Sequence, residues 1–488
     1  MSPTPKTQME MEESVCISDR CEGFLPSIPF QSEFKFDLLQ PHELVYEALP
    51  QLVKYGTVRD CIGDLPFVNV SFQYESMFDS NCVLLETLEE QEAVFSLFGF
   101  LASSYVHVQS ALEKTKPVLL PECVAMPLKR LAGHLDRYPI LDYGGCVLYN
   151  WVLEDPHEEL TLENIRILRT FTRISSEEWF YKIHIAIEYY GGEAIVSMQD
   201  IFQIVPPSSF SMDAEVVHFE VVRRVHNLME SVVDSLKHMN SVLDRMREGC
   251  KSHDFYNIVR PWLSGWNAAG VIYGDSGELP EVYSGGSGAQ SSLLPCFDAF
   301  LGLQHATHTP EDDKFLKSLR SYRNAMPKKH RALIEKLESG NSIRVYIEYL
   351  ERSHAKLKID SRDNNVPLYM NEENERSSIS LGQHMKQIKL AYNACVEQVL
   401  SFRRKHIGLA ISYISSQARL TAQSVKDEGT RAEMMEQAKV GTGGSHFSSH
   451  LSRHIDDTRR CLYEVDDVSK IDRSGGLAQF SIFSRYHS

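Results

Sequence analysis

The chain has 488 residues, of which 43% are hydrophobic and 24% are charged. This composition is typical of a globular protein long enough for two or more domains. Its formal net charge is −16, from 66 acidic and 50 basic residues. Because so acidic a chain repels phosphates and anionic lipids, we expect neither nucleic-acid binding nor attachment to a membrane surface.

The cysteines and the termini indicate the compartment. The ten cysteines are scattered without a Cys-x-x-Cys pair, and no signal peptide precedes them, so they are expected to be reduced. The first residues are acidic, unlike a transit peptide. No apolar run reaches the ~18–20 residues of a membrane span. We therefore expect a cytoplasmic protein.

The N-terminal part begins with residues 1–28, which are expected to form a disordered tail. Thr87 and Glu90 have capping-box spacing before residues 93–108, which are apolar on nearly all sides and are predicted to form a buried helix. Residues 67–72 and 194–196 are candidates for short strands.

Ser175 and Glu178 repeat the capping-box spacing ahead of a second helix. One face of this helix is predicted to carry Phe180, Ile183, His184 and Ile187. His184 and Glu188 are four residues apart, which suits a metal pair. A buried acid–base or hydrogen-bonding role is more economical in such apolar surroundings, and the pattern equally suits a hydrogen-bonded core histidine.

Residues 217–246 keep an apolar stripe opposite a charged face and are predicted to form a long amphipathic helix. In residues 255–266, Arg260 is the only charge among aromatic and aliphatic side chains. A charge so surrounded needs a partner, which is either an internal acid or the carboxylate of a ligand.

Residues 284–292 form a glycine-rich loop before an apolar helix at 293–303, which Ser291 or Ser292 would cap. Glycines let backbone approach a planar ligand, and a helix start offers free N–H groups to an anion. The loop lacks the Lys-Ser/Thr pair of a P-loop, so a flexible loop with a helix cap is the alternative.

His406 interrupts an apolar stripe in residues 385–414, the most regular helical stretch. A neutral imidazole pointing from a helix into an apolar space can ligate a metal, and cations one turn back suit a cofactor with carboxylates, such as haem. The alternative is a hydrogen-bonded core histidine. Residues 360–378 and 421–439 are polar and are predicted to be surface loops, the second with higher helical propensity.

Near the C-terminus, residues 441–445 form a second glycine loop, which suits either a lid with Thr442 as a donor or an interhelical turn. His446, His450 and His454 then lie on one side of the following helix. Three imidazoles so placed can hold zinc, although their angle to the apolar face favours solvent exposure. Taken together, the chain is predicted to be all-α, with a smaller N-terminal part and a larger C-terminal one.

Several segments, in order, resemble the indoleamine 2,3-dioxygenases, haem enzymes that open the indole ring of tryptophan. They are PILDYGGCVLYNW at 139–151, Arg260 with LSGW at 263–266, GGSGAQSS at 285–292, CFDAFLG at 296–302, AYNAC at 391–395, RRKH at 403–406 and GTGG at 441–444. The resemblance runs from about residue 139 to 462 and is weaker before that.

The resemblance implies a small helical domain over residues 29–172, packed on a large helical domain over residues 173–488, with haem b between them and mobile loops near 360–380 and 421–445. His406 matches the proximal iron ligand, and Arg403 and Asp298 match polar residues at the haem periphery. The substrate-binding residues are matched by Phe255, Arg260, Tyr143, Cys146, Val147, Phe180, Ser287, Gly288 and Thr442. Phe255 would pack on the indole, and Arg260 would pair with the carboxylate.

Three departures stand out. His184 aligns where the animal enzymes usually have serine, whereas the related tetrameric tryptophan dioxygenases have a histidine that accepts the indole N–H. Here it could do the same, or hydrogen-bond bound O₂. Tyr256 stands where an aromatic hydrocarbon ring is usual. The third departure is extra length, mainly residues 345–383 and the N-terminal tail.

The resemblance therefore implies a monomeric enzyme that converts L-tryptophan and O₂ to N-formylkynurenine, toward kynurenine and NAD, with an electron donor that keeps the haem ferrous. The alternatives are a non-enzymatic O₂-binding haem protein of the same fold and a dioxygenase acting on another indole.

Overall fold

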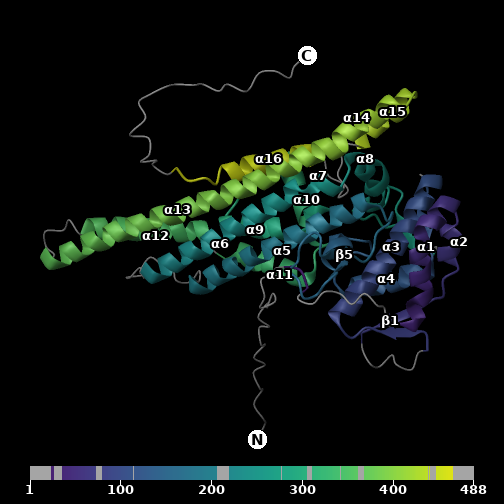
Figure 1. The fold of residues 1–488 in the computed structure, drawn as a ribbon, viewed down its shortest axis with the longest axis horizontal. Helices are drawn as coiled ribbons and strands as arrows, with labels where there is room; N and C mark the ends of the chain where they lie inside the picture. Colours follow the sequence, from purple (N-terminus) through teal and green to yellow (C-terminus); the bar gives the residue numbers. More distant parts are fainter. Residues whose placement is uncertain are drawn as a thin grey trace, which may run out of the picture.

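The computed structural model describes residues 24–26, 36–72, 80–113, 115–205, 219–275, 277–304, 310–340, 342–360, 368–437, 439 and 447–464. Helices dominate this part of the chain (Figure 1), which confirms the all-α class. In the described ranges, six short strands pair in three two-stranded sheets: β1–β2 and β3–β6 are parallel, and β4–β5 is antiparallel. They are β1 (Asn69–Ser71), β2 (Cys82–Leu84), β3 (Val118–Leu120), β4 (Trp151–Leu153), β5 (Ile165–Ile167) and β6 (Val271–Tyr273).

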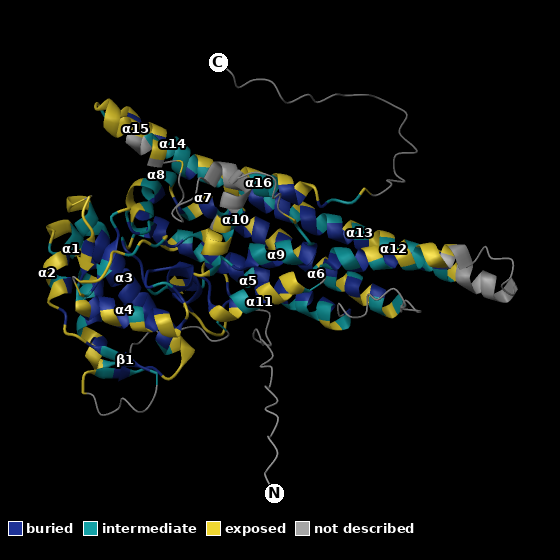
Figure 2. Ribbon diagram, turned by 180° about the vertical axis from the view of Figure 1, so that it is seen from behind, coloured by how far each residue is buried: buried dark blue, intermediate teal, exposed yellow. Residues whose placement is uncertain are grey.

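The N-terminal helices gather at one end of the molecule (Figure 1). They are α1 (Gln40–Tyr55), α2 (Val58–Gly63), α3 (Leu88–Leu112) and α4 (Glu122–His134). As predicted, Thr87 and Glu90 form the capping box of α3. The central turns of α3 are buried on all sides (Figure 2).

Long helices make up the other end, where α5 (Ser175–Ile204) packs on α6 (Phe219–Asp244) and α6 packs on α13 (Leu368–Ala410). Around them lie α7 (Met246–Gly249), α8 (Ser252–Asp254), α9 (Leu293–Leu301), α10 (Pro310–Arg323), α11 (Lys328–Ser339), α12 (Ile343–Asp360), α14 (Ser416–Gln423), α15 (Glu428–Gln437) and α16 (Phe447–Arg459). α12 and α16 both pack on α13. A division into two domains at residue 172 remains a proposal.

Four local predictions need correction or qualification. Residues 194–196 lie inside α5 and are not a strand, because the apolar stripe of that helix continues through them. Ser175 does not cap α5, because the helix begins at Ser175 itself, with Ile174 at the N-cap position and no side-chain cap. Residues 368–378 belong to α13, and residues 421–439 are largely helical in α14 and α15. Most of the expected N-terminal tail lies outside the described residues.

The described residues contain three short π-helical turns: η3 (Gly144–Leu148), η5 (Phe255–Val259) and η8 (Ile411–Ser415), which joins α13 to α14. Such turns occur often at functional sites because they re-aim side chains. Two of them place an aromatic residue, Phe255 or Tyr413, in the wall of one cavity, and Tyr143, immediately before η3, lines it too.

A buried ion cluster holds η3 in place. The guanidinium of Arg137 is fully buried between the carboxylates of Glu92 on α3 and Asp142, and Asp142 also accepts the N–H of Gly145 at 2.9 Å. A Cβ on Gly144 would lie 2.2 Å from Arg137 Nη1, so only glycine fits there. The ion pairs of Arg137 with Glu92 and Asp142 therefore hold in place the turn that follows Tyr143. Among the helices of the described residues, none combines the length and the apolar character that crossing a bilayer requires.

Candidate active site

A cavity of about 1450 Å³ lies among α5, α6, α9 and α13. This volume exceeds the roughly 300–1,000 Å³ of ordinary small-molecule sites, so it can hold a large planar cofactor together with a substrate. Of the residues proposed from the sequence, it is lined by Tyr143, Phe180, His184, Phe255, Arg260, Ser287, Gly288, Asp298, Arg403 and His406.

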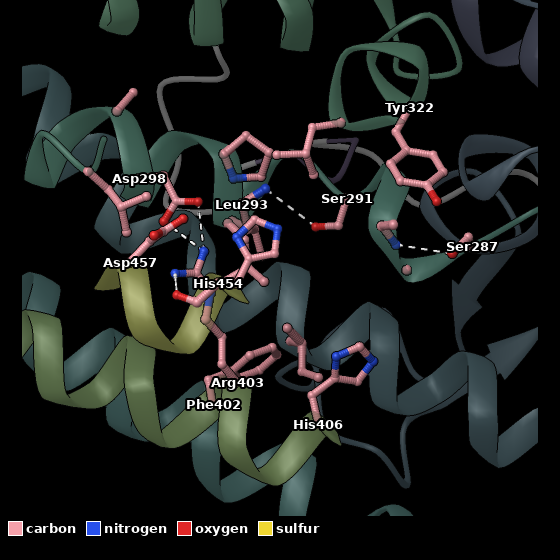
Figure 3. A pocket seen from close by; sticks show the side chains of 18 of the residues that line it. Ser287, Ser291, Leu293, Asp298, Tyr322, Phe402, Arg403, His406, His454 and Asp457 are labelled. Atoms are coloured by element: carbon pink, nitrogen blue, oxygen red, sulfur yellow. Dashed lines mark hydrogen bonds and ion pairs between the residues drawn. The ribbon is translucent and has the colours of Figure 1, made fainter. Parts of the chain in front are cut away.

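His406 points from the last turns of α13 into this cavity (Figure 3). Its accessible surface faces the cavity, and no other described residue hydrogen-bonds the ring. Burial, reinforced by His184, lowers the pKa of His406 to about 4. The imidazole is therefore neutral at neutral pH and presents a nitrogen lone pair to the cavity, as a metal ligand must.

Arg403 lies one turn before His406 and is buried at the edge of the same cavity. Its guanidinium makes two hydrogen bonds to the carboxylate of Asp298 on α9, at 2.7 and 2.6 Å (Figure 3). It also contacts the hydroxyl of Thr458 on α16. Both bonds to Asp298 come from Nη2, and this charge-assisted pair ties α13 to α9 one turn before His406.

His184 lies on α5 and faces the cavity beside Phe180 and Gly288. Its Nδ1 lies 2.8 Å from the carbonyl oxygen of Phe180. A carbonyl can only accept, so Nδ1 carries the proton. Burial lowers the pKa of His184, so the ring is neutral and Nε2 is an acceptor. A Cβ on Gly288 would lie 3.4 Å from Nε2, so the glycine loop packs closely there.

Aromatic rings form the wall next to His184. Phe180 on α5 and Phe255 on η5 have ring centroids 4.8 Å apart, and Tyr413 on η8 meets Phe255 edge-on at 5.8 Å. All three side chains line the cavity. They make a dry slot that suits a flat apolar ring.

Arg260 begins the short helix η6 (Arg260–Leu263), directly after η5, and lines the cavity. Burial lowers the pKa of its guanidinium, and the ring of Tyr256 lies 5.7 Å away. A cation that has lost solvation at a cavity wall is stabilised by an anion that binds there.

The glycine-rich loop closes the cavity on the side of His184. Ser287 caps η7 (Gly288–Gln290), a short helix that precedes α9. Gly285 packs against the segment after Arg260, because a Cβ there would lie 2.2 Å from the carbonyl of Leu263. Gln290 accepts the N–H of Tyr143 and donates to the carbonyl of Gly285.

Other predicted residues are placed differently. Cys146 and Val147 are buried behind Tyr143 and do not line the cavity. Thr442 and the loop at 441–445 lie outside the described residues, as do His446 and the side chain of His450. His454 lines the cavity beside Arg403. Within the described ranges no three metal-binding side chains cluster, and the zinc triplet stays a prediction.

One end of the cavity was not predicted from the sequence. It is lined from α10, α11 and α12, by side chains that include Arg320, Arg323, Glu338 and Arg344. No motif marks these residues in the sequence, because they come together only when α11 and α12 pack against α9 and α10 packs against η7.

Comparisons with known proteins agree with the geometry. Residues 16–461 match the family model described as indoleamine 2,3-dioxygenase. Indoleamine 2,3-dioxygenase 1 of Mus musculus is 24% identical over 433 residues, which cover 87% of this chain and 90% of the mouse protein. The Saccharomyces cerevisiae indoleamine 2,3-dioxygenase is 27% identical over 476 residues, covering 91% and 92%. Human indoleamine 2,3-dioxygenase 2 is 26% identical over 466 residues, covering 93% and 97%.

Proposed function

Since the chain belongs to the indoleamine 2,3-dioxygenase family, a family of haem-dependent oxidoreductases, we propose that it inserts both atoms of O₂ across the indole C2–C3 bond of L-tryptophan. The product is N-formylkynurenine, which leads toward kynurenine and NAD. The observation that carries this proposal is that one cavity has the neutral imidazole of His406 and the half-buried guanidinium of Arg260 in its walls.

The residues of the cavity fit haem b. His406 offers a free nitrogen, the volume is large enough, and Arg403 with Asp298 forms a polar edge at which carboxylates can lie. A ferrous haem held by His406 would supply the binding and activation of O₂. An external electron donor would keep the iron ferrous. We also propose that the enzyme is a cytoplasmic monomer.

The substrate would be held at three points. Arg260 pairs with its carboxylate, and Phe255 and Phe180 enclose the indole ring. His184 accepts the indole N–H at Nε2, because its Nδ1–H is already donated to Phe180. Holding the ring at a fixed place beside the cofactor provides much of the rate in such reactions. Ser287 and Gly288 cover the site, and Thr442 would serve as a donor from the second glycine loop.

The same hydrogen bond weighs against an oxygen carrier. Bound O₂ is stabilised by a hydrogen-bond donor, whereas neutral His184 presents an acceptor to the cavity. A protein that only binds O₂ also does not need a cation such as Arg260 to pair with a substrate carboxylate.

Turnover tests the function directly. Purified, haem-loaded protein is mixed with L-tryptophan, O₂ and a reductant, and we expect N-formylkynurenine by absorbance and mass spectrometry. Tryptamine, which lacks the carboxylate, is the matched control and should react far less efficiently. A stable oxygenated spectrum without formylkynurenine would refute the enzyme and leave the oxygen carrier. Turnover of another indole alone would reassign the substrate.

The role of His184 is tested by His184→Ser. We expect KM for L-tryptophan to rise by up to about tenfold, the worth of one hydrogen bond, while kcat stays close to that of the wild type. 1-Methyl-L-tryptophan has no indole N–H and should bind the two proteins equally. A large loss of kcat at unchanged KM would instead make His184 an obligatory acid or base.

A further inference from the structure

Glu188 is a buried carboxyl group immediately behind the wall of the cavity. It lies on α5, one turn after His184, with none of its surface exposed. Its Oε1 accepts the hydroxyl of Tyr143 at 2.9 Å and the hydroxyl of Ser291 at 2.5 Å. Tyr143 and Ser291 line the cavity, and Glu188 does not. One oxygen atom therefore ties α5 to the segments before η3 and before α9.

These hydrogen bonds determine whether the hydroxyl groups of Tyr143 and Ser291 can donate a hydrogen bond to a ligand or only accept one. Each hydroxyl has a single proton, and both protons are donated to Glu188. Ser291 Oγ also accepts the N–H of Leu293 at 3.3 Å. While Glu188 is ionised, the two hydroxyl groups therefore have no proton left to donate to the cavity, and this part of the wall can only accept hydrogen bonds.

We propose that Glu188 is a positioning residue that sets the hydrogen-bond polarity of this wall. With Glu188 ionised, Tyr143 and Ser291 are both acceptors toward the cavity. A proton on Oε2 would have no acceptor in the described part of the chain, so protonation of Glu188 places the proton on Oε1. The Oε1–H is then donated to one of these hydroxyl oxygens, and that hydroxyl turns its own proton into the cavity. Ligands that present N–H groups there are favoured by the ionised form.

The electrostatics place this change near neutral pH. Burial raises the pKa of Glu188 to about 7, although the hydroxyls of Ser291 and Tyr143 oppose the rise. The second oxygen, Oε2, is buried without a hydrogen-bond partner in the described part of the chain, which also disfavours the charged form.

The titratable groups around Glu188 do not change charge in the same range. Burial raises the pKa of Tyr143, of Cys146 behind it and of Cys296 on α9 above their ordinary values, so all three are neutral. Burial lowers the pKa of His184, so that ring is neutral as well. Glu188 is therefore the group at this wall that titrates between pH 6 and 8.

Infrared difference spectroscopy tests the protonation without any turnover. The full chain is titrated from pH 5 to 9, and the carbonyl stretch of protonated carboxyl groups is followed in wild type and Glu188→Gln. We expect a band that titrates near pH 7 in the wild type and is missing from Glu188→Gln.

Glu177, on the same helix, provides the matched control, because burial raises its pKa as well. Glu177→Gln keeps an oxygen that can accept the N–H groups of Phe171 and Thr172, and it should leave the band of Glu188 in place. Identical titrations of wild type and Glu188→Gln would overturn the proposal, whatever reaction the protein catalyses.

The consequence for binding rests on the proposed function and is measured on ferric, haem-loaded protein without reductant. We expect L-tryptophan to bind the wild type about tenfold more tightly at pH 8 than at pH 6. Glu188→Gln, whose amide oxygen still accepts the hydroxyls, should lose this difference. Glu188→Leu, with no acceptor, should bind weakly at both pH values.

The proposed substrate and the proposed role of Glu188 would be contradicted by different results. If L-tryptophan binds at neither pH while the Glu188 band titrates, the proposed substrate is wrong and the polarity of the wall stands. If L-tryptophan binds with the same pH dependence in wild type and Glu188→Gln, the role of Glu188 is wrong.

Discussion

His406→Ala is expected to abolish stable haem binding. Even partners outside the immediate ligand shell of a metal contribute about 10- to 100-fold in affinity, so loss of the ligand itself should weaken haem binding by more than about a hundredfold. The fold should survive, because the His406 ring makes no hydrogen bond within the described residues. The measurement is a haem titration followed at the Soret band, with circular dichroism as the check on folding.

Two control measurements test whether the loss of haem is specific to the His406 side chain. His454→Ala removes the other imidazole beside Arg403 while keeping the backbone carbonyl that Arg403 contacts, and it should retain the Soret band. Added imidazole should restore haem binding to His406→Ala, because it can occupy the space left by the side chain. Full haem retention by His406→Ala without imidazole would refute the ligand assignment.

Arg260→Ala is expected to raise KM for L-tryptophan strongly and to spare haem binding. Removing one partner of a desolvated charge pair costs about 2–5 kcal/mol, which corresponds to roughly 30-fold or more in KM. The reason is that the carboxylate would enter the cavity without the one cation that the sequence places among these aromatic residues. Steady-state kinetics with L-tryptophan provide the measurement.

Arg260→Lys and tryptamine serve as controls. A lysine at this position keeps the positive charge but cannot bind a carboxylate through two parallel hydrogen bonds. The KM of Arg260→Lys should therefore fall between those of wild type and Arg260→Ala. Tryptamine has no carboxylate, so its KM should differ very little between wild type and Arg260→Ala. An unchanged KM for L-tryptophan would mean that Arg260 does not bind the carboxylate.

Much of the local structure could be predicted from short-range rules. The capping box of Thr87 and Glu90, the buried helix α3, the amphipathic helix α6 and strand β1 all follow from spacing and burial pattern. The same rules failed at the start of α5. The helix already includes Ser175, with Ile174 at the N-cap position and no side-chain cap, and Glu177 instead binds the N–H groups of Phe171 and Thr172 in the segment before the helix.

Polarity was a poor guide to loops. Residues 368–378 are rich in Asn, Glu and Ser, yet they form the first turns of α13. Glutamate and arginine favour helices without any apolar stripe, and α12 packs alongside α13. A polar stretch at the end of a long helix can therefore remain helical when a neighbouring helix runs beside it.

The sequence by itself determined which side chains are available for the chemistry: an imidazole on an apolar stripe, a lone guanidinium among aromatic residues and a glycine-rich loop. Only the tertiary structure decided how they meet. It placed Cys146 and Val147 behind the wall, bound Nδ1 of His184 to Phe180, and brought Tyr143 and Ser291, 148 residues apart, onto one oxygen of Glu188. Periodicity reports which face of a helix is apolar, whereas the direction of a hydrogen bond depends on partners from distant segments, which no local pattern contains.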